Sequence, residues 1–207
     1  MMGVTGPVKR WHRGLTRAGV AQAALALLDS GGWSALTMRR LAADLDVTGA
    51  ALYAHVADKD DLLDAVLDLV LDAVKLPDAG VDPREALVQG FSDYRRALVA
   101  HPEVVRLMTR RSRLSAAQVR LVEGSVRLFL AAGLDLRAAV DAHVTVIAFT
   151  VGFMVQEVGR PTDPPDAALL EGAPLFREVV GVLVARPVDE RFGVGLGAVL
   201  DGVLIAS

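Results

Sequence analysis

Hydrophobic positions along this chain recur with the spacing of buried helix faces, and no stretch alternates as a strand would. Residues that commonly cap helices precede several of these stretches, among them Thr16, Thr48, Asp58, Ser115 and Asp135. The pattern therefore predicts an all-α fold. Its helices are expected over residues 16–31, 38–45, 48–54, 58–75, 82–100, 102–110, 115–133, 135–158, 175–185 and 189–206.

Two of the expected helices are short and are separated by only two residues. In the first, Leu41, Ala42 and Leu45 fall on one face. In the second, the buried positions are expected at Ala51 and Leu52, with Val56 just beyond the helix end. Asp46 and Val47 leave room only for a turn between them. This layout is typical of a helix-turn-helix, whose second helix enters the major groove of DNA.

The same stretch resembles a known family of regulators. Its segments are Leu-Thr-Met-Arg-Arg-Leu-Ala (36–42), Val-Thr-Gly-Ala-Ala-Leu-Tyr-Ala-His-Val (47–56) and Asp-Lys-Asp-Asp-Leu-Leu-Asp-Ala (58–65). They resemble the DNA-binding domain of TetR-family repressors, and Leu-Tyr-x-His-Val-x-x-Lys is the most diagnostic run. The resemblance is strong over residues 15–67 and weaker to about residue 157. Asp46 stands where the family usually has Gly, and Asp tolerates the left-handed backbone of that turn.

The resemblance and the side-chain chemistry together give candidate contacts to double-stranded DNA. Thr48 can donate to phosphate or base, and the fork of Arg39 suits guanine. Gly49 lets the second helix approach closely, and the family pattern places Tyr53 and Lys59 on phosphates. The alternative is that the aromatic rings of this region only pack the small domain. The full set of expected DNA-binding residues is Thr37, Arg39, Thr48, Gly49, Ala50, Tyr53, His55 and Lys59.

Charge is distributed unevenly along the chain. Residues 1–43 hold six basic side chains and one acid, a net of +5, which leaves −8 for the rest of a chain whose net charge is −3. A basic end on an acidic body is typical of a protein that meets nucleic acid with one end, although a basic tail without a partner would read the same. We expect a flexible basic arm over 1–14, a DNA-binding domain over 15–76, a break at 77–80 and a second domain over 81–207.

The second domain resembles the ligand-binding domain of the tetracycline-repressor branch, over residues 94–101 and 128–134. That branch uses His to hold a magnesium–drug complex, but the corresponding residues 106–109 here include no His. A more apolar small-molecule effector fits better. Equally, the residues expected to line its pocket could be core, and His143 could be a satisfied core histidine. The expected set is Tyr94, Met108, His143, Phe149, Phe153 and Met154.

Several classes of function are disfavoured by what the sequence lacks. There is no Cys, so a disulfide framework or a Cys-based zinc site is impossible. No hydrolase, phosphate-loop or dinucleotide motif occurs, so no enzyme activity, cofactor or metal site is expected. The best membrane candidate, Val144–Val155, has 12 residues against the roughly 18 needed to span a bilayer. We expect no membrane partner and a cytoplasmic location.

Hydrophobic residues make up 53% of the chain, more than one subunit needs to cover. This excess favours a homodimer through the helices at 135–158 and 189–206, the latter having small residues that permit close approach at Gly193, Gly195, Gly197 and Gly202. The sequence thus predicts a ligand-responsive repressor that binds a palindromic operator as a homodimer and is released by an effector, which moves the helix at 58–75. The alternative is a helical small-molecule-binding protein or enzyme on this fold that does not bind DNA.

Overall fold

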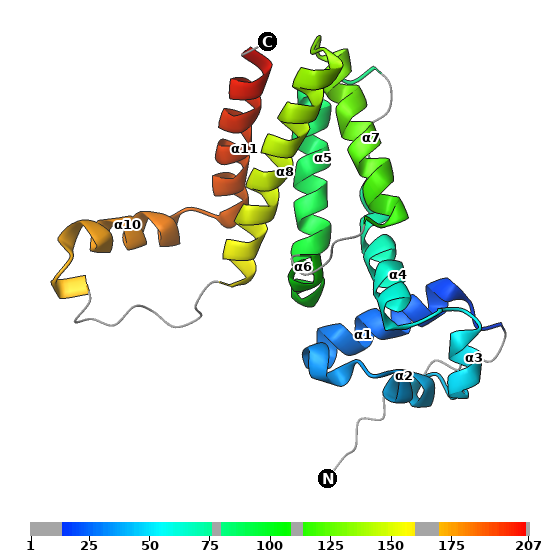
Figure 1. Ribbon diagram of the computed structural model, residues 1–207. Coiled ribbons are helices and arrows are strands. Elements are labelled where there is room, and N and C mark those ends of the chain that lie inside the picture. Colours follow the sequence, from blue (N-terminus) through cyan, green and yellow to red (C-terminus); the bar gives the residue numbers. More distant parts are fainter. Residues whose placement is uncertain (1–13, 76–79, 109–113, 160–169, 206–207) are drawn as a thin grey trace. The chain divides into compact units, whose positions relative to one another are not determined.

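The computed structural model describes residues 14–75, 80–108, 114–159 and 170–205, and within these ranges it contains helices and no strand (Figure 1). The all-α prediction is confirmed. The helices are α1 Arg17–Ala35, α2 Met38–Asp44, α3 Gly49–Tyr53, α4 Lys59–Leu71, α5 Pro83–Val99, α6 Pro102–Met108, α7 Ala116–Ala131, α8 Leu136–Val158, α10 Pro174–Ala185 and α11 Val188–Ile205.

The chain divides into two compact units, residues 1–70 and 71–207. The expected basic arm over 1–14 falls almost wholly on residues 1–13, and the expected break at 77–80 falls largely on 76–79. Both of these segments lie outside the described residues. The arm and the position of the break therefore stay predictions.

Side-chain caps begin the helices where the sequence predicted them. Thr16 accepts a hydrogen bond from the Gly19 amide at 3.0 Å, and Asp58 accepts one from Asp61 at 2.8 Å. Ser115 forms a complete capping box with Gln118. These acceptors satisfy amide groups that a helix leaves unpaired in its first turn, so the start of each helix is fixed by a local signal.

Two helix ends differ from the prediction. Helix α4 ends at Leu71 rather than near residue 75, because the chain turns there, with the Val74 amide bonded to the Leu71 carbonyl at 3.0 Å and the Val74 side chain buried. Helix α1 is interrupted at Gly32, where φ is 64°, and then continues for one more turn to Ala35. The left-handed backbone expected near Gly32 is present, but it kinks the helix instead of ending it.

The first unit has its own apolar core, built from one face of each helix. Its fully buried side chains include Val20, Leu28, Leu41, Leu52 and Leu62. Trp33 is only half-buried, and its ring centroid lies 6.0 Å from the ammonium of Lys59. The core is thus aliphatic, and it fixes which sides of α2 and α3 face outward.

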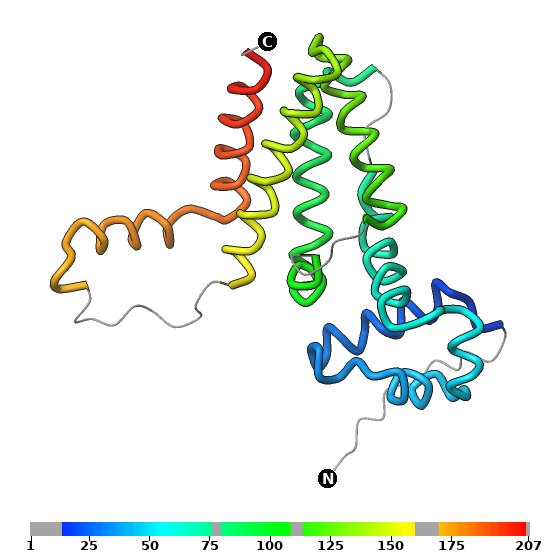
Figure 2. The backbone as a smooth tube through the Cα atoms, viewed as in Figure 1, coloured from blue at the N-terminus to red at the C-terminus, as the bar shows by residue number. Residues whose placement is uncertain are grey.

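In the second unit α5, α7, α8 and α11 pack as a bundle (Figure 2). Its core contains Leu87, Phe129, Val146 and Leu196, one from each of these helices. A buried Arg95 crosses the bundle as well, with ion pairs to Glu157 on α8 at 2.8 Å and to Asp189 on α11 at 2.6 Å.

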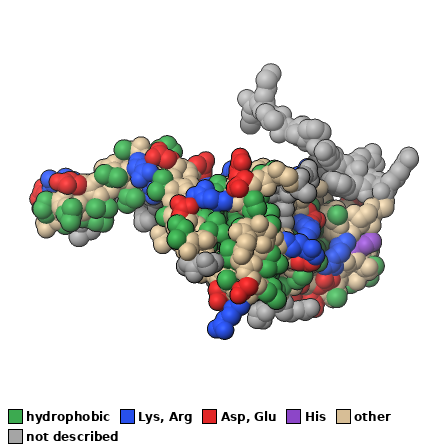
Figure 3. Space-filling view, turned by 90° about the horizontal axis from the view of Figure 1, so that it is seen from above, with side chains coloured by type: hydrophobic (Ala, Val, Ile, Leu, Met, Phe, Trp, Pro, Cys, Tyr) green, Lys and Arg blue, Asp and Glu red, His purple; other side chains and the backbone are tan. Residues whose placement is uncertain are grey.

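Apolar side chains also remain exposed on this unit. Helix α10 has no buried residue, although Leu175, Phe176 and Val184 lie along it. Figure 3 shows hydrophobic side chains on the surface of the molecule. Helix α8 exposes a row of side chains four residues apart on the surface, and α11 exposes two more; they are Leu136, Val140, Val144, Val194 and Ile205. Contiguous apolar surface of this kind usually marks a contact with another molecule.

Helix α8 is 23 residues long and passes the length and composition test for a membrane-spanning helix. The apolar stretch Val144–Val155 considered from the sequence is therefore only part of this helix. Ala139, Ala142, Val146, Thr150 and Met154 are buried in the bundle of the second unit, so α8 is a core helix.

Candidate DNA-binding surface and ligand cavity

The turn between α2 and α3 has the geometry that the sequence predicted. Asp46 has φ of 55°, in the left-handed region where the related sequences have Gly. The following amide, that of Val47, bonds to the Ala42 carbonyl at 2.9 Å. Asp is one of the few side chains that accept this backbone without large strain, so the tight turn survives the substitution.

Helix α3 is fixed by Leu52, which is fully buried, while Gly49, Ala50 and Tyr53 face solvent. The Tyr53 side chain is 54% exposed, so its ring is not part of the small core. Ala51 was expected to be buried but is only half-buried, because a helix of five residues presents a single side to the core. A methyl group built on Gly49 would meet no atom within 4 Å, so the surface in front of α3 is open.

Two threonine hydroxyls hold the starts of the motif helices. Thr37 accepts from the Arg40 amide at 3.1 Å, and Thr48 accepts from the Ala51 amide at 3.2 Å. Because each oxygen acts as acceptor for the cap, its own proton remains available to donate to a phosphate or a base. Both residues are exposed.

The remaining expected DNA-binding residues differ in exposure and in the contacts that they make within the protein. Arg39 is exposed and forms no ion pair with the described residues. Lys59 donates to the carbonyl of Leu36 at 3.1 Å, so one of its three protons is already used inside the unit. His55 is half-buried, and its carbonyl accepts from Arg17 at 3.2 Å.

The structure also shows a clasp that the sequence analysis missed. Arg17 is bidentate to Asp61, with Nη1–Oδ2 at 2.7 Å and Nη2–Oδ1 at 2.6 Å. Hydrogen bonding to Asp61 raises the pKa of Arg17. Arg17 had been counted with the basic end of the chain, but its charge is matched by Asp61. The two residues are 44 positions apart, and no local signal connects them.

The second unit contains a cavity of about 200 Å³ lined from α5, α7 and α8. Its wall is mainly apolar and includes Leu87, Phe91, Leu121, Val122 and Ile147, together with Val74, which follows α4. The volume is smaller than that of most small-molecule sites, which are about 300–1,000 Å³.

Two of the six residues expected to bind a ligand, Tyr94 and His143, line this cavity. Met108 does not line it but lies behind Tyr94, with its sulfur 3.9 Å from the Tyr94 hydroxyl. Burial raises the pKa of Tyr94, so its hydroxyl stays protonated over the whole physiological range.

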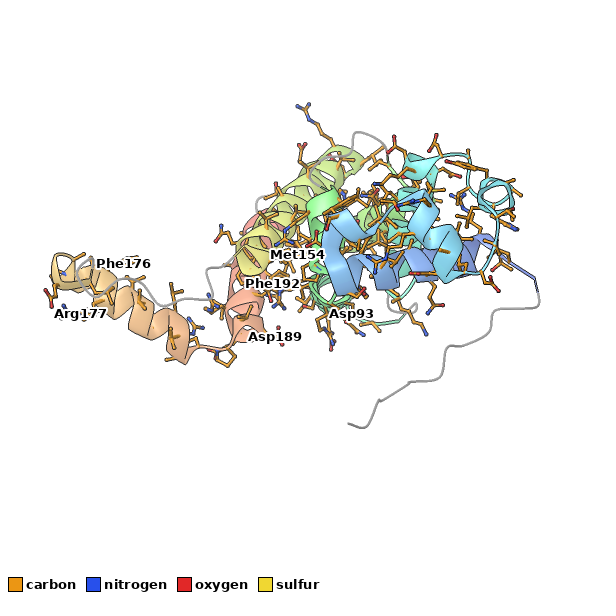
Figure 4. The ribbon with its side chains drawn as sticks, turned by 90° about the horizontal axis from the view of Figure 1, so that it is seen from below. Asp93, Met154, Phe176, Arg177, Asp189 and Phe192 are labelled. Atoms are coloured by element: carbon orange, nitrogen blue, oxygen red, sulfur yellow. The ribbon has the colours of Figure 1, made fainter. Side chains whose placement is uncertain are left out.

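The other three, Phe149, Phe153 and Met154, are not among the residues that line this cavity, so the cavity brings together only part of the expected set. Phe149 and Phe153 pack against Phe192 of α11, with ring centroids 5.7 and 5.2 Å away, and Met154 is fully buried. Phe192 and Met154 are labelled in Figure 4. The reason is helical geometry. His143 and Ile147, four residues apart, face the cavity, whereas Phe149 and Phe153 form another row that faces α11.

Two of the polar side chains that line the cavity, Ser125 and His143, contact each other. Ser125 Oγ lies 2.7 Å from Nδ1 of His143 and donates to the Val122 carbonyl at 2.9 Å. Burial lowers the pKa of His143, which favours the neutral imidazole. Ser125 was not among the expected residues, because a lone serine in a helix carries no sequence signal of its own.

A magnesium–drug complex of the kind used by the tetracycline-repressor branch does not fit this cavity. Mg²⁺ prefers oxygen ligands such as carboxylates, and the described residues that line the cavity include no Asp or Glu. Over the described parts of the chain, no group of three or more His, Cys, Asp or Glu residues is placed to hold a metal ion.

Comparison with known proteins gives the same picture for both units. The family model described as "Bacterial regulatory proteins, tetR family" matches residues 17–66, and the one described as "Tetracyclin repressor-like, C-terminal domain" matches residues 76–206. The class A tetracycline repressor protein from transposon 1721 of Escherichia coli is 32% identical over 191 residues, which cover 89% of this chain and 88% of that protein.

Solved structures are similar over nearly the whole chain. Streptomyces coelicolor ActR in complex with actinorhodin has a TM-score of 0.76 and 28% identity, covering 93% of this chain and 98% of that one. BioQ with its natural double-stranded DNA operator has a TM-score of 0.68 and 31% identity, covering 92% and 99%.

Proposed function

The chain belongs to the TetR family of bacterial regulatory proteins, and from this membership we propose that it represses transcription as a homodimer on a palindromic DNA operator. It is a ligand-responsive transcriptional repressor and not an enzyme. Proteins of this family are soluble DNA-binding regulators, and we place this one in the cytoplasm. The observation that carries the proposal is the exposed face of α3. The buried side chain of Leu52 fixes the opposite face of this helix, and the left-handed turn at Asp46 precedes it.

We assign direct readout to Arg39 and Thr48, close approach to Gly49 and Ala50, and phosphate contacts to Tyr53 and Lys59. The assignment rests on exposure and chemistry: a guanidinium that forms no ion pair with the described residues, a capping hydroxyl with a free proton, and an open surface in front of the helix. A solved structure of the related BioQ holds its double-stranded DNA operator.

Dimerisation through α8 and α11 is supported by the apolar side chains that these helices leave exposed. Val144 is 56% exposed and Val194 58% exposed. A symmetric pair of two helices from each subunit would bury both rows in a four-helix arrangement. We expect light scattering at micromolar concentration to give a mass twice that of the 21.9 kDa chain. Val144→Glu should lower the measured mass toward that of the monomer. A wild-type protein of 21.9 kDa would contradict the dimer.

The cavity is the proposed effector site, and its neighbours suggest how the effector acts. Helix α7, which lines it, is joined to the end of α4 by Arg120, which binds Asp72 at 2.8 Å and the Leu71 carbonyl at 3.3 Å. Val74, three residues beyond α4, lines the cavity itself. An effector that favours a different arrangement of these residues shifts α4, and the shift lowers DNA affinity by linkage.

A mobility-shift assay with the DNA upstream of its own gene tests the function. Ala50 is exposed on α3, so Ala50→Glu should leave folding intact and greatly weaken the shift by placing a negative charge against phosphate. The matched control is Ala131→Glu, on an exposed position of α7 in the second unit, which should bind DNA as the wild type does. A folded protein whose DNA affinity is the same in all three forms would support the alternative, a ligand-binding protein without DNA binding.

A further inference from the structure

We propose that the effector is a compact apolar molecule with a hydroxyl group, and that this hydroxyl donates a hydrogen bond to Nε2 of His143 at the polar end of the cavity. The inference rests on the proposed function, which makes this cavity the effector site.

The first step is the position of the one serine proton. Ser125 Oγ donates to the Val122 carbonyl at 2.9 Å, so its oxygen has only lone pairs to offer to His143, whose Nδ1 lies 2.7 Å away. With the serine proton on the Val122 carbonyl, we assign the proton of the neutral imidazole to Nδ1, with Ser125 Oγ as its acceptor. In the neutral ring the other nitrogen, Nε2, is then a bare acceptor.

The second step concerns the hydrogen bonding of Nε2. This nitrogen forms no hydrogen bond with the described residues, and the ring of His143 is part of the cavity wall. The ring of Phe91 lies 6.5 Å away and offers no polar donor. His143 is half-buried, so a bound apolar molecule would cover this acceptor and leave it unpaired, which is costly, whereas a donor on the ligand would satisfy it.

The third step concerns the rest of the ligand. Besides His143 and Ser125, only Tyr94 and Gln118 bring polar side chains to the described part of the cavity wall, and the other side chains there are apolar, among them Leu87, Phe91 and Ile147. A charged group would be desolvated there without a counter-charge from the described residues, because those that line the cavity include no Asp, Glu, Lys or Arg. A neutral hydroxyl on an aromatic or alicyclic body meets both requirements.

The test uses two probes of nearly the same shape, 2-naphthol and its methyl ether 2-methoxynaphthalene, with the full chain and no DNA. Calorimetry should show 2-naphthol binding at least roughly tenfold more tightly, because a site with an unpaired acceptor rejects an analogue that cannot donate to it. His143→Leu should bind both probes equally while thermal unfolding shows that the variant is folded. His143→Gln, which keeps an acceptor, should retain part of the preference.

Equal affinity of the two probes for the wild type, or an unchanged preference in His143→Leu, overturns the proposal. Tighter binding of the ether overturns it as well, because Nε2 would then carry the proton. If neither probe binds, the cavity does not take such an apolar body, and the proposal fails. These measurements contain no DNA, so they fail independently of the mobility-shift test of the proposed function.

Discussion

The guanidinium of Arg17 and the carboxylate of Asp61 meet end to end, with two hydrogen bonds of 2.7 and 2.6 Å that join the first residue of α1 to the first turn of α4. The same pair holds the segment between α3 and α4. Asp61 Oδ2 accepts from the Ala57 amide at 2.8 Å, and Arg17 Nη1 donates to the His55 carbonyl at 3.2 Å. The far end of α3 is therefore fixed from outside the helix.

Arg17→Met should loosen that end. The side chains of Arg17 and Asp61 are 45% and 31% exposed, so we expect a loss of about 1 kcal/mol in the free energy of unfolding. Operator affinity should fall for all sequences alike, because α3 is less well held. Thermal unfolding and mobility shifts measure the two effects.

The matched control is Arg84→Met in the second unit. Arg84 is also 45% exposed and also forms two hydrogen bonds to one carboxylate, that of Asp201. Arg84→Met should lower the free energy of unfolding by a similar amount and leave DNA affinity unchanged. Equal losses of affinity in the two variants would show that the clasp has no special bearing on α3.

Gly49→Ala should separate DNA approach from folding. A methyl group at this position meets no atom within 4 Å, and Ala favours a helix by about 1 kcal/mol over Gly, so the free protein should be as stable as the wild type or slightly more so. Operator affinity should nevertheless fall, because the methyl group occupies the space in which α3 approaches the groove.

Gly181→Ala on α10 is the control, since a methyl group there also meets no atom within 4 Å. We expect fluorescence anisotropy with labelled operator DNA to show weaker binding for Gly49→Ala alone. Unchanged affinity of Gly49→Ala would mean that the glycine is not a point of close contact.

Much of the DNA-binding unit could be predicted because its signals are local. The caps at Thr37 and Thr48, the buried Leu41 and Leu52, and the turn at Asp46 all depend on residues within a few positions of one another. The clasp of Arg17 and Asp61 could not be predicted, because it joins residues that only the tertiary fold brings together.

The ligand cavity was only partly predictable for a different reason. Helix α8 is apolar on nearly every side, so its periodicity does not tell which face meets a cavity and which meets another helix. His143 and Phe153 were both plausible from sequence. Their contacts in the structure differ, because Phe153 packs against Phe192 and against the guanidinium of Arg95. The central carbon of that guanidinium lies 5.6 Å from the Phe153 ring centroid.

Close helix approach, expected at four glycines of α11, depends most on one of them. A methyl group on Gly195 would lie 2.6 Å from the end of the Phe149 ring. Gly195→Ala should therefore destabilise the second unit by about 1–3 kcal/mol through overpacking. A methyl group on Gly193, two residues earlier on the same helix, would meet no atom within 4 Å, so Gly193→Ala should not destabilise the unit.

A double-mutant cycle with Phe149→Leu tests the cause of the Gly195 effect. The shorter side chain frees the space, so Gly195→Ala should cost much less in that background, as measured by urea unfolding. Additive effects would show that the Phe149 ring is not what the methyl group strikes.

Stability should depend on pH through His143. Burial lowers its pKa below the usual value of about 6.5, so in acid the unfolded chain binds a proton that the folded chain does not. This contribution to stability is complete above about pH 6.5 and is lost as the pH falls toward the folded-state pKa. Tyr94, the other titratable group of the cavity, remains neutral throughout because burial raises its pKa.

Urea unfolding at several pH values between about 5 and 8 checks this expectation. The curve for His143→Leu should be flatter on the acid side than that of the wild type. Parallel curves for the two proteins would mean that His143 does not couple folding to protonation.

Arg39 and Lys59 should have different roles on DNA, which a selection on randomised operator sequences can separate. Arg39 is exposed and unpaired within the described residues, so it is free to reach a base edge. Arg39→Ala should cost about 1–3 kcal/mol per half-site and relax the preference at one base pair. Lys59 already donates to Leu36, and its two remaining protons suit a phosphate. Lys59→Ala should weaken all sequences about equally and make the salt dependence shallower by about one unit per subunit.

The bond from Lys59 to Leu36 adds a complication that the experiment must resolve, since Lys59→Ala also removes an internal contact of 3.1 Å. Unfolding measurements on the same variant give the size of that loss, and only the salt slope reports the phosphate. An unchanged slope with lower stability would make Lys59 a structural residue. If Arg39→Ala left the selected motif unchanged while Lys59→Ala altered one position, the two roles would have to be exchanged.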